Sequence, residues 1–211
     1  IASKAVPADL VSQVAAMFPS FGQEWMDDRT RSLATRYLLR KPRPDLVLVH
    51  FVDLDSEAHD NGPFSSQANA ILEYTDELIG SILADLPREY AFVLVSDHGF
   101  ERVDREINLH VIAASAGVQG VRSMGGIAVA ETEEAAAFLR KTSGVGREIP
   151  RNEVSSFAQK LSKATAIFEP APNVWFGSAT AGEPESKPHE VGTHGHWLSR
   201  YRSVYLAWAR V

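Results

Sequence analysis

Two short apolar runs, separated by a stretch of helical periodicity, most constrain the fold of this chain. Residues 45–52 (DLVLVHFV) and 91–95 (AFVLV) are apolar on both faces and rich in β-branched residues, as in strands buried inside a parallel sheet. Between them, apolar positions keep helical spacing over residues 64–83. A strand, a helix and a second strand form a βαβ unit, whose strands end at one edge of the sheet. The sequence therefore predicts an α/β fold with a ligand site at that edge.

The rest of the chain predicts helices before this unit and a looser region after it. Residues 53–62 are polar and are interpreted as a loop. Residues 102–190 are interpreted as an insertion, a cap region over the ligand-binding edge. The other predicted elements are helices at 10–17, 28–38, 131–141 and 153–161, strands at 107–112, 127–130 and 203–209, and an exposed loop at 179–188.

Composition excludes several classes of protein and of site. The 211 residues are 45% hydrophobic and 23% charged, which argues against a disordered or fibrous chain. A net charge of −6, without a long Lys/Arg run, argues against a nucleic-acid polymer as partner. No apolar run is long enough to predict a membrane segment. The absence of cysteine leaves histidines and carboxylates as the strong metal ligands.

Three polar motifs at predicted strand–loop junctions contain the candidate metal ligands. Residues 53–59 (DLDSEAH) follow the first apolar run, and residues 97–99 (DHG) follow the second. Residues 194–196 (HGH) lie in a glycine-flanked turn before the last predicted strand. Imidazole nitrogen and carboxylate oxygen together suit borderline divalent ions such as Zn²⁺ or Mn²⁺. A lone Asp-His pair is usually a surface turn, but three such motifs at one sheet edge predict a metal site.

These motifs resemble those of the alkaline phosphatase superfamily, in its type I phosphodiesterase/nucleotide pyrophosphatase branch. The resemblance rests on the order and spacing of five short segments within residues 40–211. They are PDLVLV at 44–49, D-x-x-x-H at 55–59, Gly62-Pro63, VSDHGF at 95–100 and GTHG at 192–195. The resemblance implies an alkaline phosphatase-like α/β fold with a mostly parallel sheet flanked by helices and an inserted cap.

The resemblance also implies a two-metal hydrolase. One ion would be held by Asp55, His59 and His194, and the other by Asp97 and His98 with an upstream aspartate and a Thr or Ser nucleophile. No residue of the chain has the context of that nucleophile, so residues 1–211 are expected to be the C-terminal part of a catalytic domain. The expected cofactors are two divalent ions, Zn²⁺ or Mn²⁺. The expected substrate is a small phosphodiester or a nucleotide, and the family suggests a periplasmic or extracellular location.

Other conspicuous residues have structural explanations as well as functional ones. His50 is expected to be a packed histidine or one that supports a metal ligand, and His110 is expected to be structural. Asp53 either supports a ligand histidine or is a solvated acid. His189 and His196 could reach a metal or substrate, although solvent exposure is the simpler expectation. Trp175 and Phe176 could stack on a base, but core packing of the cap is the simpler expectation.

The sequence also leaves two other classes of protein as alternatives. A sulfatase or a cofactor-independent phosphoglycerate mutase would use a similar metal scaffold. A non-catalytic metal-binding module would keep the ligands without a nucleophile.

Overall fold

The computed structural model describes residues 9–21, 26–123, 126–154, 161, 163–195 and 206–210. The chain divides into two compact units. The first unit comprises residues 1–58, 64–96 and 205–211, and the second comprises residues 59–63 and 97–204. No helix among the described residues combines the length and the apolar character needed to cross a bilayer.

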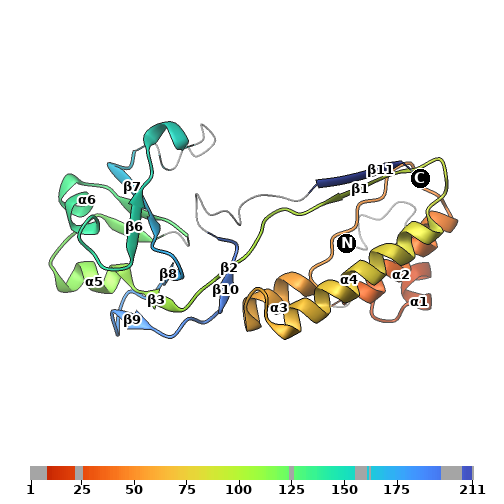
Figure 1. The fold of residues 1–211 in the computed structure, drawn as a ribbon, viewed down its shortest axis with the longest axis horizontal. Helices are drawn as coiled ribbons and strands as arrows, with labels where there is room; N and C mark the ends of the chain where they lie inside the picture. Colours follow the sequence, from red (N-terminus) through yellow and green to blue (C-terminus); the bar gives the residue numbers. More distant parts are fainter. Residues whose placement is uncertain are drawn as a thin grey trace. The chain divides into compact units, whose positions relative to one another are not determined.

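Helices dominate the first unit. They are α1 (Leu10–Met17), α2 (Asp28–Arg40), most of α3 (Asp53–Asn61) and α4 (Ser66–Asp85). Helix α2 begins where the Asp27 carboxylate accepts the Thr30 N–H at 2.7 Å, and α4 begins where the Ser65 hydroxyl accepts the Ala68 N–H. Figure 1 shows α2 and α4 lying side by side, and buried Leu39 and Ile82 are core residues of these two helices. The helices predicted at 10–17, 28–38 and 64–83 are confirmed.

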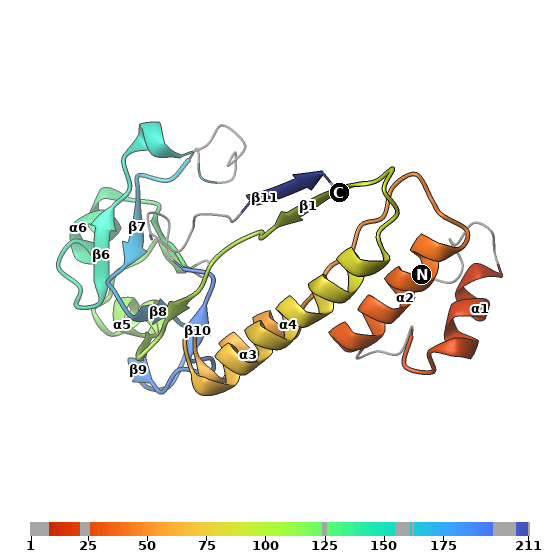
Figure 2. The same ribbon diagram turned by 45° about the vertical axis from the view of Figure 1, so that its right-hand side comes forward.

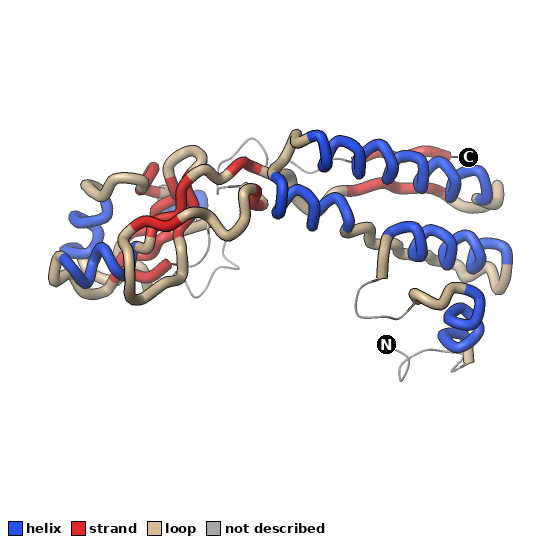
Figure 3. Tube along the Cα trace, turned by 90° about the horizontal axis from the view of Figure 1, so that it is seen from below, coloured by secondary structure: helices blue, strands red, loops and turns tan. Residues whose placement is uncertain are grey.

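The strands of the first unit differ from the prediction. Strand β1 (Ala91–Val95) forms, but it pairs with β11 (Leu206–Arg210) in antiparallel register, as Figure 2 shows. Residues 45–52 are not a strand: Figure 3 draws them as loop, and Leu46 and Leu48 are 72% and 85% exposed. The prediction that both runs are buried strands of one parallel sheet is therefore wrong for the described residues. The physical reason is that neither run is enclosed by neighbouring strands on both sides.

Residues 53–61 form helix α3 instead of the predicted loop. The segment has no apolar periodicity, so sequence patterning gives no sign of a helix. Its first turn nevertheless holds two acidic residues, Asp53 and Asp55, which favour a helix N-terminus. Its start is fixed by contacts from α2 that are described below.

The second unit is built around an antiparallel four-stranded sheet in the order β4-β5-β7-β6. These strands are Val121–Ser123, Ala128–Ala130, Ala166–Pro170 and Val145–Glu148. Helices α5 (Leu109–Ser115) and α6 (Glu133–Leu139) supply Leu109 and Leu139 to its core, which also contains Phe168 and Phe176. The strand predicted at 127–130 and the helix predicted at 131–141 are confirmed.

Two smaller sheets complete the second unit. Strand β3 (Arg105–Ile107) lies between β8 (Val174–Phe176), which is parallel to it, and β9 (Glu185–Ser186). Strand β2 (Glu101–Arg102) pairs with β10 (Gly192–Thr193). The strand predicted at 107–112 is wrong, because the chain turns at Asn108 and continues as α5. A 3-10 turn covers Arg151–Glu153, and most of the helix predicted at 153–161 lies outside the described residues.

Candidate metal centre

Helix α3 carries two of the predicted metal ligands, and its start is held by a buried carboxylate of another helix. Asp28, at the first position of α2, is 1% exposed. Its carboxylate accepts the Val52 N–H at 2.9 and 3.0 Å and the Asp53 N–H at 2.9 Å. The Asp53 carboxylate in turn accepts the Asp28 N–H at 3.0 Å. The two helix N-termini therefore cap each other, which satisfies backbone donors that a helix start leaves without partners.

The charges in this double cap are unequal. Arg31 donates to Asp28 at 2.9 Å and balances its negative charge. Burial raises the pKa of the Asp53 carboxyl above its usual range, and nearby Asp28 raises it further, against the lowering effect of the Asp28 N–H. The start of α3 is thus a partly buried acidic pair held in place by hydrogen bonds, and it lies six residues before His59.

The ring of His59 is oriented by the segment that leads into β10. Its Nδ1 atom lies 2.9 Å from the Gly192 carbonyl oxygen and 3.0 Å from Oε2 of Glu190. The Val191 N–H also donates to the His59 carbonyl oxygen at 2.9 Å. Because both neighbours of Nδ1 are acceptors, that atom carries the proton in a neutral ring, and the lone pair remains on Nε2. His59 therefore presents Nε2 as a ligand atom.

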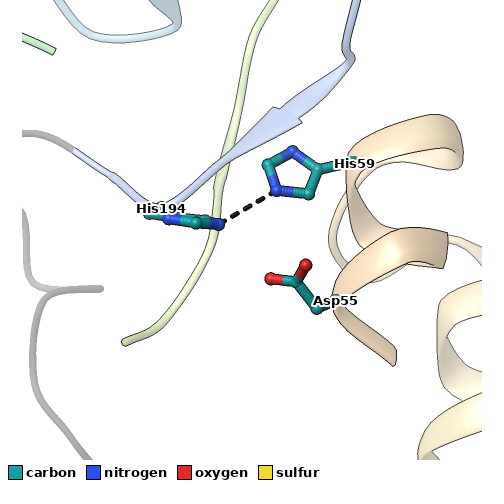
Figure 4. Close-up of side chains that lie close together, drawn as sticks. All are labelled: Asp55, His59 and His194. Atoms are coloured by element: carbon teal, nitrogen blue, oxygen red, sulfur yellow. Dashed lines mark hydrogen bonds between the residues drawn. The ribbon is translucent and has the colours of Figure 1, made fainter. Parts of the chain in front are cut away.

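His194 meets that ligand atom from the turn after β10. The Nε2 atoms of His59 and His194 lie 2.9 Å apart. Figure 4 marks this contact with a dashed line. Gly195, the next residue, has a φ of +85°, a conformation that favours glycine and lets the chain turn directly after the histidine. Asp55 lies one turn before His59 on α3. Ligand atoms of Asp55, His59 and His194 all lie within 4.8 Å of one another.

Asp97 and His98 lie near this group without joining it. The His98 ring stacks on the His194 ring, with centroids 3.5 Å apart and planes 20° apart. The Asp97 side chain is 72% exposed, and its carboxylate accepts the His98 N–H at 3.1 Å. His98 Nδ1 faces the Gly99 carbonyl at 3.2 Å. The assignment of these two residues to a second ion stays a prediction.

Phe100 packs against all three of these histidines. Its ring meets His59, His98 and His194 edge to face, with centroids 4.9, 5.6 and 5.3 Å away. An apolar ring at this position limits the rotation of the imidazoles and excludes water from one side of them. The three histidines and Phe100 therefore form a preorganised cluster.

The donor set of the first group fits a divalent transition metal. One carboxylate and two imidazoles are ligands of the kind found in catalytic zinc sites, which keep a further position open. Imidazole nitrogens bound to one tetrahedral Zn²⁺ lie roughly 3.4 Å apart, given Zn–N distances of about 2.0–2.1 Å. The observed 2.9 Å between the two Nε2 atoms differs by about half an ångström from that value. Asp55, His59 and His194 are thus the residues that could hold an ion with little rearrangement.

A sequence model of the type I phosphodiesterase/nucleotide pyrophosphatase family matches residues 11–190. That range contains Asp55, His59, Asp97 and His98 and ends just before β10. The chain belongs to this family. The family assignment confirms the resemblance to the alkaline phosphatase superfamily. No curated protein sequence matches the chain.

Solved structures of related proteins show the same fold as this phosphodiesterase-family chain. Phosphonoacetate hydrolase from Sinorhizobium meliloti, in complex with phosphonoformate, aligns with a TM-score of 0.59 at 17% identity, covering 85% of this chain and 49% of its own. Human ectonucleotide pyrophosphatase/phosphodiesterase 5 aligns with a TM-score of 0.60 at 14% identity, covering 84% and 50%. The chain therefore has an alkaline phosphatase-like α/β fold and spans about half the length of these proteins.

Sequence reasoning missed three groups that shape the site. Glu190 and the Gly192 carbonyl orient His59, and Asp28 holds the start of α3. Glu190 lies four residues before His194, so its proximity to a predicted ligand was a usable signal. Asp28 offered no such signal in the sequence, because its role depends on contacts with Val52 and Asp53, which lie 24 and 25 positions away. His189 is exposed as expected, Trp175 is half-buried, and His196 lies outside the described residues.

Proposed function

We propose that this chain is part of a metal-dependent hydrolase of phosphodiester and pyrophosphate bonds. Its catalytic domain would be completed by upstream sequence that carries a Thr or Ser nucleophile and a further aspartate ligand. The family assignment supports the reaction class, and the half-length match to solved structures supports a larger whole. The cap interpretation of residues 102–190 belongs to this proposal.

The observation that carries the proposal is the convergence of Asp55, His59 and His194. Three ligand atoms from positions up to 139 residues apart lie within 4.8 Å, and His59 has its Nδ1 atom against a carbonyl and a carboxylate. A surface cluster without function would not need a histidine anchored on one nitrogen and aimed with the other. We assign these three residues to the first ion, which we propose to be Zn²⁺, with Mn²⁺ as the alternative.

Asp97 and His98 are assigned to the second ion. The stacking of His98 on His194 supports this, because it holds the DHG motif beside the first group. Two divalent ions held by these residues would supply activation of a nucleophilic oxygen and stabilisation of the charge that develops on the phosphoryl group and the leaving group. The role of this chain's residues is then to hold both ions and to limit water access through Phe100.

Small phosphorylated molecules are the proposed substrates. The structural neighbours include a phosphonoacetate hydrolase in complex with phosphonoacetate and a murine ectonucleotide pyrophosphatase/phosphodiesterase 5 in complex with AMP. Both ligands are small anions bearing a phosphorus–oxygen group, consistent with a site of cations and imidazoles. A phosphodiester of a nucleotide is the class we propose for this protein.

The proposal is tested on the protein expressed from its complete reading frame. We expect hydrolysis of bis(4-nitrophenyl) phosphate that is abolished by a chelator and restored by Zn²⁺ or Mn²⁺. His194→Ala is expected to lower kcat/KM by about a hundredfold or more, whereas exposed His189→Ala leaves it nearly unchanged. Metal binding without any turnover would favour the non-catalytic module, and chelator-resistant turnover would contradict the proposal.

A further inference from the structure

A small cavity of about 190 Å³ is lined by residues that all belong to the second unit. They come from β3, β8, β10 and the segment that leads into β10, and none of the three proposed metal ligands is among them. Glu190 and Gly192 both line the cavity, and both also contact Nδ1 of His59. The cavity therefore adjoins the Nδ1 side of His59, away from the ligand atom Nε2. We call it the Trp175 cavity, after the indole in its lining.

The register of the small sheet β8-β3-β9 explains why part of this lining is polar. Ile107 and Phe176 lie in the buried core of the second unit. Successive side chains of a strand point to opposite faces, so Glu106 and Trp175 lie on the face turned away from that core. Glu106 is the register partner of Trp175 on β8 and of Ser186 on β9. Its carboxylate accepts the Ser186 hydroxyl at 3.2 Å, and Glu106 and Trp175 both line the cavity.

The negative charge of half-buried Glu106 is not balanced by a lysine or an arginine. Among the described residues, no Lys or Arg forms an ion pair with it, and none lines the cavity. Arg105, its neighbour in the sequence, is paired with Glu185 at 2.8 Å. Lys187 is exposed and forms no ion pair within the part of the chain that the structure describes. A cavity lined by charge of one sign concentrates the field of that charge, so the Trp175 cavity attracts cations.

Two buried polar side chains in this region have hydrogen-bonding capacity that the described residues do not use. Thr193 is 5% exposed and lines the cavity, and its hydroxyl forms no hydrogen bond with a described residue. Asn108 is 3% exposed, and its Oδ1 atom has no partner among the same residues. A Cβ atom on Gly177 would lie 2.2 Å from this Oδ1 and 2.7 Å from Oε1 of Glu106, so two acceptor oxygens face one point. Because buried polar groups are nearly always paired, the arrangement favours an occupant that donates hydrogen bonds.

The size and chemistry of the lining together favour a small organic cation. The volume is below the roughly 300–1,000 Å³ of pockets for drug-sized ligands, so the cavity admits a head group of a few atoms. The face of an indole ring attracts cations, and a primary ammonium group donates three hydrogen bonds. A bare metal ion fits less well, because among the described residues only the Asp55 group brings three His or acidic ligand atoms within 4.8 Å of one another.

We propose that the Trp175 cavity binds the primary ammonium group of a small molecule. The Trp175 ring, the Glu106 carboxylate and the Thr193 hydroxyl would hold it. The site is additional to the proposed metal centre and requires neither an ion nor a nucleophile. Its occupant would lie next to Glu190 and Gly192, the two residues that orient His59.

The proposal is tested on the protein from its complete reading frame after metal ions have been removed, so that an amine cannot bind an ion instead. Propylammonium is the probe, propionate is its anionic counterpart, and adenine tests the alternative that a base stacks on Trp175. Ligand-observed saturation-transfer NMR measures binding. Glu106→Gln removes the charge and keeps the shape of the side chain, whereas Trp175→Phe reduces the aromatic surface. Glu134→Gln, at an exposed position of α6, is the matched control.

We expect propylammonium to bind with a Kd of roughly 1 mM or lower, and propionate not to bind. Glu106→Gln should weaken binding at least about tenfold, because it removes a charged acceptor. Trp175→Phe should weaken it about threefold, because a phenyl ring attracts cations less strongly than an indole. Glu134→Gln should leave it unchanged.

Absence of saturable propylammonium binding, or binding that Glu106→Gln leaves unaffected, would overturn the proposal. Saturable binding of adenine without binding of propylammonium would assign the cavity to a base, and would also overturn it. These readouts require neither a bound metal ion nor turnover, so failure of the proposed function is recognised separately.

Discussion

The Nε2 atoms of His59 and His194 face each other at 2.9 Å, although the two residues are 135 positions apart in the sequence. The Gly192 carbonyl and Glu190 hold the opposite nitrogen of His59, so its ring is fixed before any ligand arrives. Preorganisation of this kind reduces the free-energy cost of gathering ligands around an ion.

Glu190 is expected to strengthen metal binding through His59. Glu190→Ala should weaken Zn²⁺ binding about 10- to 100-fold, because it removes an acceptor and a negative charge from Nδ1 of His59. Glu190→Gln, which keeps an oxygen acceptor, should weaken it less. Competition with a chromogenic chelator measures both affinities. Glu183→Gln, at an exposed acid outside the site, is the control, and an affinity unchanged by Glu190→Ala would remove Glu190 from the site.

Asp28 is expected to be important for stability. Asp28→Ala should lower the free energy of unfolding by about 2–4 kcal/mol, because the N–H groups of Val52 and Asp53 lose their buried acceptor. Asp28→Asn keeps one oxygen acceptor and should cost less. Urea unfolding followed by circular dichroism gives both values. Asp76→Ala, at an exposed position of α4, should change stability by no more than about 0.5 kcal/mol; a similar small value for Asp28→Ala would contradict the double cap.

The dependence on Asp28 shows why the sequence predicted some elements and not others. Helices α2 and α4 carry their own signals, an N-cap side chain and apolar periodicity, and both were predicted. Helix α3 is specified by a carboxylate of α2, which no local pattern reveals. Asp55, His59 and His194 could be predicted as candidate ligands because they belong to recognisable motifs, whereas Glu190 contacts His59 only through its position in space.

Residues 45–52 and 107–112 show two other limits of prediction. The first segment has a strand's composition but forms no ladder among the described residues, because strand pairing depends on neighbours that local sequence does not supply. In residues 107–112, the apolar residues of α5 follow almost directly after strand β3, so the sequence pattern predicts one continuous strand. Short apolar runs do not distinguish a strand from a buried helix.

An ion-pair cluster between α2 and α4 predicts a pH dependence of stability. Hydrogen bonds from Arg40 and Arg36 lower the pKa of the Asp85 carboxyl below its usual value. Its stabilising effect is therefore present above the unfolded pKa of about 3.9 and is lost as the pH falls through the depressed folded value. Asp85→Asn should lower the free energy of unfolding by about 1 kcal/mol near neutral pH. The difference between the two proteins should shrink below about pH 4, and a difference independent of pH would contradict the ion pairs as its cause.

The 211-residue chain by itself is expected to turn over phosphodiesters poorly or not at all. The proposed nucleophile lies outside it, so bound ions would have no Thr or Ser to activate. The measurement is release of 4-nitrophenolate from bis(4-nitrophenyl) phosphate, with and without added Zn²⁺. Robust metal-dependent turnover by the pure chain would show that it contains its own nucleophile.

Titration of the metal-free 211-residue chain with Zn²⁺ in a calorimeter tests the central claim most directly. In the proposed assignment, Asp55, His59 and His194 would provide three ligands to one ion, whereas Asp97 and His98 would provide only two to the other, so we predict at most one tightly bound Zn²⁺. His194→Ala should weaken this binding by orders of magnitude, and His189→Ala should leave it nearly unchanged. Two equally tight Zn²⁺ ions, or binding that is unaffected by His194→Ala, would contradict the assignment of these residues to the metal centre.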